Sequence, residues 1–209
     1  MRKFIGLLAA LLACFSMAII SPTPTHAQQK DTYTVKRGDT LWIISQKYQI
    51  GLSEIIQANP QFDNPDLIYP GDKVTVPLKR ALKSIEQEVI RLTNAERAKY
   101  GLPALRGNWE LSRVARYKSR DMRDNNYFSH TSPVYGSPFQ MMRNFNISYE
   151  KAAENIAAGQ TSPQQVVQGW MDSSGHRKNI LDKNVTHIGV GYAKGGSYGH
   201  YWTQMFLKK

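Results

Sequence analysis

Hydrophobic positions divide the chain into stretches with different patterns. The first, Phe4–Ile20, is almost continuously apolar, follows a short basic start and ends before the small-x-small pattern Thr25–Ala27. These features are typical of an export signal. We therefore expect a signal peptide over residues 1–27 and a mature start at Gln28. An uncleaved membrane anchor, and a lipoprotein that uses Cys14, are alternative interpretations of the same run.

Residues 31–78 show strand-like patterns at both ends and helical patterns between them. β-Branched and aromatic residues predict strands at 32–35 and 73–77. Spacing of i, i+3, i+4, i+7 predicts one helical face formed by Leu41, Ile44, Ser45 and Tyr48. A second helix is predicted from Leu52, Ile55 and Ile56, with Ser53 as its cap and Pro60 as its end. The order strand, helix, helix, strand predicts a small domain with a small core.

Residues 83–209 place helical patterns first and strand patterns last. Helices are predicted over 85–100, 109–125, 137–144 and 163–171, with Ser84 and Asn108 as the caps of the first two. Strands are predicted over 187–193 and 198–206, joined by a hairpin at Gly195 and Gly196. This order predicts an α+β domain. Residues 79–82 are expected to link the two domains.

Charge supports the division into two domains. The formal net charge is +11, but residues 31–78 hold four basic and six acidic residues, whereas residues 82–209 hold eighteen and ten. Such a change of sign suggests separate domains. The basic residues are scattered and no nucleic-acid-binding signature accompanies them, so we expect no nucleic-acid partner; an anionic wall or membrane surface fits better.

Composition excludes several classes of protein. After Ile20 no run reaches the 18 or more apolar residues of a spanning helix, so no stable membrane insertion is expected once the signal is cleaved. Cys14 is the single cysteine, and it lies in the predicted signal. A mature chain without thiols excludes a disulfide framework, a cysteine-ligated zinc site and a cysteine nucleophile.

Three motifs in the first domain point to a known family. They are YTV-x-x-GDTL from Tyr33 to Leu41, Asn59-Pro60, and I-x-PG-x-x-V-x-VP from Ile68 to Pro77. With these motifs, residues 31–78 resemble a LysM module in a βααβ fold. The resemblance implies binding of N-acetylglucosamine-containing glycans such as peptidoglycan or chitin.

The same resemblance implies where the sugar would lie. In the family it occupies a shallow groove between the first turn and the loop before the last strand. The corresponding positions here are Gly38, Asp39, Thr40, Leu41, Leu67, Ile68, Tyr69 and Pro70. Exposed backbone groups and an apolar shelf suit an acetamido sugar. The alternative is that Leu41, Ile68 and Tyr69 are core residues.

Six segments of the second half match another family in order. They are LTNAERAKYGLPAL, NYFSHTSP, AENIAAG, V-x-GWMDSSGHRKNIL, IGVGYA and YWTQMF. Residues 85–207 thereby resemble the CAP superfamily of cysteine-rich secretory, antigen-5 and pathogenesis-related (SCP-like) proteins, in its bacterial branch. The resemblance implies a three-layer α-β-α sandwich with an open cleft that holds two histidines and two acids.

By motif, the two histidines of that cleft are His130 and His176, and the first acid is Glu154. The chain departs from the pattern at the second acid, whose position is Ser173. The nearest acid is Asp172, one residue away. The departure puts any role that requires two carboxylates in doubt.

Several chemistries suit these groups. Two imidazoles and a carboxylate with an open position suit Zn²⁺ or another divalent cation, so we expect a metal at His130 and His176, with Glu154 as a third candidate ligand. They also suit general acid–base work, for which the candidates are His130, Glu154, Asp172 and His176. A buried polar network that braces the loops is the third interpretation. No organic cofactor is expected.

The leading interpretation is a secreted, cell-wall-associated protein that is not an enzyme. Its LysM module would anchor it to peptidoglycan, and its CAP cleft would bind a divalent metal and an unidentified ligand, in envelope or spore-surface biology. One alternative is a metal-dependent hydrolase of peptidoglycan or peptides. A glycosidase of the usual form needs two carboxylates, which the departure at Ser173 disfavours. The other alternative is a secreted lipid-binding protein.

Overall fold

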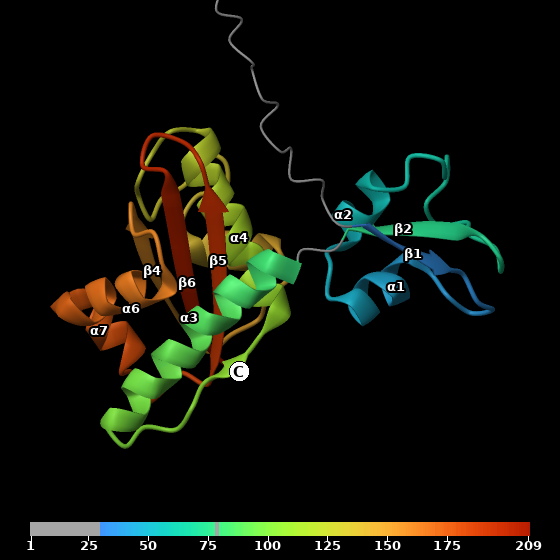
Figure 1. Ribbon diagram of the computed structural model, residues 1–209. Coiled ribbons are helices and arrows are strands. Elements are labelled where there is room, and N and C mark those ends of the chain that lie inside the picture. The colour runs from blue at the N-terminus through green and yellow to red at the C-terminus, as the bar shows by residue number, and fades with distance from the viewer. Residues whose placement is uncertain (1–29, 78–79) are drawn as a thin grey trace, which may run out of the picture.

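A computed structural model describes residues 30–77 and 80–209 (Figure 1). The predicted signal peptide, residues 1–27, and position 79 of the predicted linker lie outside these residues. In the described ranges, no helix has the length and apolar character to cross a bilayer. Figure 1 shows two folded bodies, one around a two-stranded sheet and one around a four-stranded sheet.

The N-terminal body has the predicted βααβ order. Its elements are β1 (Lys30–Thr34), α1 (Leu41–Tyr48), α2 (Leu52–Gln57) and β2 (Lys73–Pro77), and the two strands pair antiparallel. Its core contains Val35, Leu41, Ile44, Ile50, Ile55, Val74 and Val76. The predicted inner face of α1 is confirmed, and the Thr40 side chain caps that helix by accepting from the backbone N–H of Ile43.

Two details of α2 differ from the prediction. Ser53 does not cap this helix, because α2 begins at Leu52 and Ser53 is its second residue. The N-cap position is Gly51, and no side chain caps the helix. Leu52 was expected on the inner face but is 37% exposed. It lies in the first turn, beyond the small core that Ile55 enters. At the other end, the buried Asn59 amide donates to the carbonyls of Ile55 and Thr75 and thereby ties α2 to β2.

The C-terminal body is α+β, as predicted. Its helices are α3 (Arg80–Lys99), α4 (Trp109–Asp124), α5 (Pro138–Asn144), α6 (Pro163–Asp172) and α7 (Ser174–Ile180). Its strands are β3 (Arg106–Gly107), β4 (Lys151–Ala158), β5 (His187–Lys194) and β6 (His200–Lys208). The sheet order is β3-β5-β6-β4, with β3 parallel to β5 and the other pairs antiparallel.

Helix α3 begins earlier than the sequence predicted. The expected cap at Ser84 is wrong, because α3 already begins at Arg80 and Ser84 lies inside it. Most of the predicted linker is therefore helical. Positions 80–83 contain good helix formers and neither glycine nor proline, so a capping signal downstream did not stop the helix from extending toward the N-terminus.

Helices cover both faces of the four-stranded sheet. One core contains Val89 of α3, Trp170 of α6 and Phe206 of β6; the other contains Leu111 of α4, Met141 of α5 and Leu207 of β6. Helix α4 approaches β5 very closely through two strand glycines. A Cβ atom added at Gly191 would lie 2.1 Å from the carbonyl carbon of Ala115, and one added at Gly189 would lie 2.4 Å from that of Leu111.

Candidate functional site

The site predicted in the CAP-like half contains a carboxylate in contact with an imidazole. Glu154 lies within β4, where it pairs with Met205 of β6, and its side chain is 1% exposed. Its Oε1 is 2.8 Å from Nδ1 of His130, whose side chain is 52% exposed. Oε2 of Glu154 has no hydrogen-bond partner among the described residues. A buried carboxylate thus orients a half-exposed imidazole through its Nδ1 atom.

The charges of this site influence one another. Burial raises the pKa of the Glu154 carboxyl, against the opposing effects of the His130 hydrogen bond and the Lys118 charge. Burial lowers the pKa of His176, and the charge of nearby His130 lowers it further. The structure therefore brings His130, Glu154 and His176 into one region, as the sequence motifs implied.

Two charged residues of α4, one turn apart, hold the loop that carries His130. The buried Lys118 ammonium donates to the Tyr127 hydroxyl at 3.0 Å and to the His130 carbonyl at 2.9 Å. The Asp121 carboxylate accepts from the hydroxyls of Tyr127 and Ser132. Burial lowers the pKa of Lys118, and the charges of Glu154 and Asp121 oppose this effect. The backbone position of His130 is thus fixed from inside the domain.

Neither Lys118 nor Asp121 was predicted as a site residue from the sequence. The signal was present: a lysine at a buried position of a helix is rare unless it is paired.

A chain of amide side chains holds the segment that carries His176. The Asn155 amide donates to the His176 carbonyl at 3.2 Å and to Oε1 of Gln204 at 3.0 Å. Asn179 of α7 donates to Oδ1 of Asn155 at 2.8 Å. Gln204 in turn donates to the Thr93 hydroxyl of α3. These residues were missed, although amides within otherwise apolar strands are a usable signal, because buried polar groups are retained with their partners.

Asp172, the acid nearest to the position of the second acid, has no described contact with His130, Glu154 or His176. It is exposed, and its carboxylate accepts from the Gln168 amide of its own helix at 2.8 Å. Among the residues that the structure describes, no three histidine, cysteine, aspartate or glutamate side chains are placed to hold a metal ion. The Glu154 carboxylate is directed at Nδ1 of His130, so the three side chains do not fit a three-ligand site. A metal at His130 and His176 stays a prediction.

The predicted glycan groove lies in the N-terminal body. The backbone N–H of Val35 donates to the Asp72 carbonyl, and that of Gly71 donates to the Val35 carbonyl, both at 2.9 Å. These bonds bring the loop before β2 beside the segment after β1. Tyr69 is 64% exposed and Leu67 is 56% exposed, whereas Leu41 is buried and Ile68 is half-buried. Of the predicted apolar positions, Tyr69 and Leu67 are therefore available to a ligand, and Leu41 belongs to the core.

Asp39 has a structural task in the turn between β1 and α1. Its carboxylate accepts from the backbone N–H of Lys36 at 2.7 Å and from the Tyr33 hydroxyl at 2.8 Å, and these bonds lower its pKa. On the adjoining helix, Trp42 is 58% exposed and Ile43 is 41% exposed. The sequence analysis missed both, because helical periodicity identifies the buried face and leaves the outer residues unassigned.

Comparison with known proteins gives the families. Residues 90–206 match CAP, the cysteine-rich secretory protein family, and residues 33–77 match the LysM domain. "Uncharacterized protein YkwD" of Bacillus subtilis (strain 168) is 55% identical over 135 residues, which cover 65% of this chain and 51% of that protein. "Spore coat assembly protein ExsA" of Bacillus cereus is 47% identical over 47 residues, or 22% of this chain and 7% of that protein.

A solved structure agrees with these matches. It is an extracellular protein containing a SCP domain from Bacillus anthracis str. Ames, 38% identical with a TM-score of 0.56, and the match covers 67% of this chain and 47% of that chain. This chain therefore matches about half the length of both that protein and the B. subtilis relative. The CAP profile alone covers more than half of this chain, so the chain belongs to the CAP family, and it carries a LysM domain before its CAP domain.

Proposed function

We propose that this protein is an extracellular, cell-wall-associated protein whose LysM domain binds an N-acetylglucosamine-containing glycan of peptidoglycan. The observation that carries the proposal is the pairing of Val35 with Gly71 and Asp72, which brings the loop before β2 beside the segment after β1, together with the exposed side chains of Leu67 and Tyr69 in that loop. Acetamido sugars bind where exposed backbone polar groups lie next to an apolar surface. The two families and their bacterial relatives support the same setting.

Within this proposal the CAP domain presents its own cleft to a second, unidentified ligand. Of the two side chains in contact at this site, the half-exposed imidazole of His130 is accessible to a ligand, whereas the carboxylate of Glu154 is buried. No described contact favours a lipid, so lipid binding stays a prediction.

A hydrolase is the second candidate function, and one observation favours it. A carboxylate that holds Nδ1 of an imidazole leaves Nε2 free, and this arrangement is typical of an oriented general base. Glu154 and His130 have this arrangement. The residues would then act on a peptide or glycan bond that the LysM domain brings near.

One experiment tests both candidates. The mature chain is incubated with purified insoluble peptidoglycan, and the bound fraction and the soluble fragments released are measured by sedimentation and mass spectrometry. We expect Tyr69→Ala to weaken binding about fivefold or more, which is typical of losing one well-placed aromatic contact. Tyr100→Ala is the matched control, because Tyr100 is similarly exposed but lies in the CAP domain. Equal binding by both variants would contradict the proposed groove.

The released fragments decide between the candidates. Fragments that appear with the wild type and disappear with His130→Gln and His176→Gln would establish the hydrolase. Binding without fragments, with and without added Zn²⁺, would leave an anchored, non-enzymatic CAP domain.

A further inference from the structure

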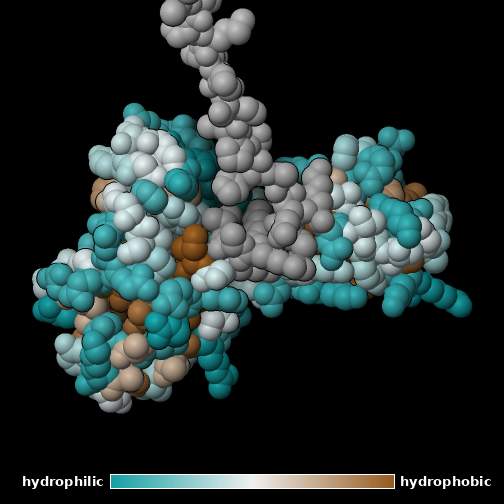
Figure 2. Space-filling model, viewed as in Figure 1, coloured by the Kyte–Doolittle hydropathy of each residue, from teal (hydrophilic) through white to brown (hydrophobic). Residues whose placement is uncertain are grey.

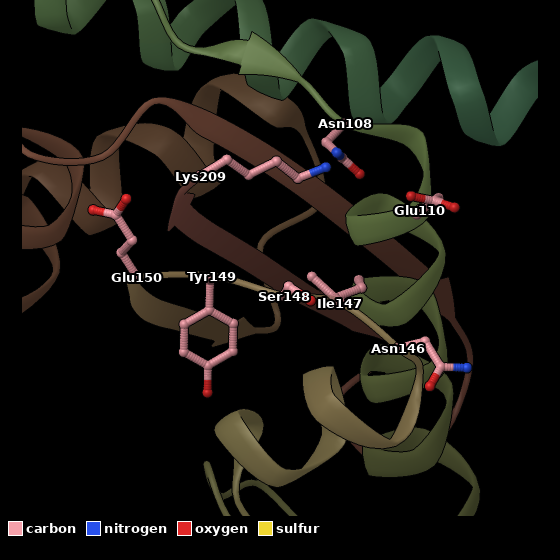
Figure 3. Close-up of a pocket in the computed structure, with 8 residues that line it drawn as sticks. All are labelled: Asn108, Glu110, Asn146, Ile147, Ser148, Tyr149, Glu150 and Lys209. Atoms are coloured by element: carbon pink, nitrogen blue, oxygen red, sulfur yellow. The ribbon is translucent and has the colours of Figure 1, made fainter.

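A second hollow lies away from the His130 site, at the end of the four-stranded sheet where β6 finishes. It has a volume of about 560 Å³ and is lined by Asn108, Glu110, Asn146, Ile147, Ser148, Tyr149, Glu150 and Lys209 (Figure 3). This volume suits a small ligand. Apart from Asn108, whose side chain caps α4, none of these residues has a role in the sites described above.

Three positively charged or titratable side chains meet at this end of the sheet. Arg106 of β3 is directly opposite His187 of β5, which is directly opposite Leu207 of β6. Residues directly opposite one another share a face of the sheet. Lys209 directly follows the last residue of β6. Burial lowers the pKa of His187, and the charges of Lys209 and Arg106 lower it further. The positive charges are therefore close enough to repel one another.

A carboxylate lies in the same hollow. Glu110 belongs to the first turn of α4, and Figure 3 shows the Lys209 side chain extending toward Asn108 in this part of the hollow. In the described part of the chain, the side chains of Glu110 and Lys209 have no hydrogen-bond or ion-pair partner. The other acid, Glu150, already pairs with Lys208. The hollow thus offers unpaired charges of both signs.

The remaining lining is uncharged. Ile147 is buried at its floor, and the half-buried Tyr149 is fixed by a hydrogen bond from Arg143 to its hydroxyl at 3.1 Å. Together they provide a rigid apolar surface for small side chains. The Asn146 amide and the Ser148 hydroxyl are exposed and can bond a peptide backbone.

We propose that this hollow binds a short peptide with a free carboxylate and a free amine. The carboxylate would lie against Lys209, and the amine against Glu110. Charge complementarity of this kind selects a zwitterionic ligand over a polyanion, because Glu110 and Glu150 would repel a dense row of negative charges. The inference stands apart from the proposed glycan binding, since it uses a different domain and different residues.

The test follows His187 in the full mature chain by NMR, with the ring signal assigned through His187→Gln. The probe is the tripeptide Lys-Ala-Ala. Its carboxylate should offset the charge of Lys209, so we expect the pKa of His187 to rise on binding and the Tyr149 ring signals to shift. The same peptide with a C-terminal amide should bind at least about tenfold more weakly, because it lacks the charge-assisted contacts.

Two lysine variants provide the controls. Lys209→Gln should raise the pKa of His187 in the free protein and weaken Lys-Ala-Ala binding about tenfold. Lys194→Gln, which removes an exposed lysine at the opposite end of β5, should change neither. Equal binding of the peptide and its amide would overturn the proposal. So would tighter binding of inorganic polyphosphate than of the peptide, which would make this end of the sheet a polyanion surface.

Discussion

At the scale of single residues, the CAP site depends on side chains that never reach solvent. His130 is half-exposed, but its backbone carbonyl, its Nδ1 and its loop are held by buried groups: Lys118, Glu154 and Asp121. Hydrogen bonds inside a domain are stronger than in water, and an unpaired partner there is costly. Residues that determine the position of the exposed imidazole are therefore buried ones.

Lys118→Met tests this dependence. Methionine keeps most of the volume but donates no hydrogen bond, so the carbonyl of His130 and the hydroxyl of Tyr127 lose a donor. We expect the free energy of unfolding to fall by about 1–3 kcal/mol, measured by guanidinium unfolding, and the His130 ring signal to broaden in NMR spectra. Lys99→Met is the control: Lys99 is exposed and its pair with Glu96 should contribute less than about 1 kcal/mol. Equal stability of the two variants would mean that Lys118 does not brace the loop.

At the scale of elements, α4 packs very closely on β5. Strand residues with side chains on this face would push the helix away, and the two glycines Gly189 and Gly191 permit backbone-to-backbone contact. This approach sets the depth of α4 in the domain, and α4 carries Lys118 and Asp121 toward the His130 loop. The two glycines, by permitting this close approach, thus help to set the geometry of the site.

Gly191→Ala should consequently destabilise the CAP domain. The added Cβ would lie 2.1 Å from backbone atoms of α4. This clash cannot be relieved by a change of side-chain rotamer, because the atoms belong to the backbone. We expect a loss of about 1–3 kcal/mol or more, as for other overpacked cores, measured as a fall in Tm. Gly175→Ala is the matched control, because a Cβ there meets nothing within 4 Å and alanine favours the helix α7. A variant at Gly191 as stable as the one at Gly175 would contradict the close approach.

At the scale of the whole molecule, the proposed attachment to a cell wall has two possible sources: the proposed glycan groove of the LysM domain and the positive charge of the chain. The formal net charge of the full sequence is +11, of which Arg2 and Lys3 of the predicted signal contribute two, and the face in Figure 2 is mostly hydrophilic with small, separate apolar patches. Attraction between exposed charges is screened when salt shortens the Debye length from about 10 Å at 0.1 M to about 3 Å at 1 M. Contacts in a glycan groove are far less sensitive to salt.

Salt should therefore separate the two contributions. We expect the wild type to keep a salt-resistant bound fraction on peptidoglycan when NaCl is raised from about 0.1 to 1 M. Tyr69→Ala should lose that fraction and retain binding at low salt only, measured by sedimentation at each concentration. If both proteins are released by salt to the same degree, charge rather than the LysM groove does the anchoring.

The sequence by itself determined both family resemblances, the order of the LysM and CAP domains and the α+β fold, and it predicted the histidines and the glutamate that the structure brings into one region. These follow from local periodicity and from motifs read along the chain, so no contact between distant residues was needed. The start of α3 at Arg80, the exposure of Leu52 and the failure of Ser53 and Ser84 as caps were not predicted. Packing and helix extension compete with such short capping signals and can override them.

The tertiary structure alone decided which polar residues meet. In the folded chain Glu154 contacts His130, Asp172 accepts a hydrogen bond from Gln168, and Asn155 donates one to Gln204. The tertiary structure also brought Arg106, His187 and Lys209 to one end of the sheet from three separate strands or their ends. Each of these contacts depends on the register of the paired strands and on how closely a helix packs on the sheet. Neither can be derived from the spacing of residues in the sequence.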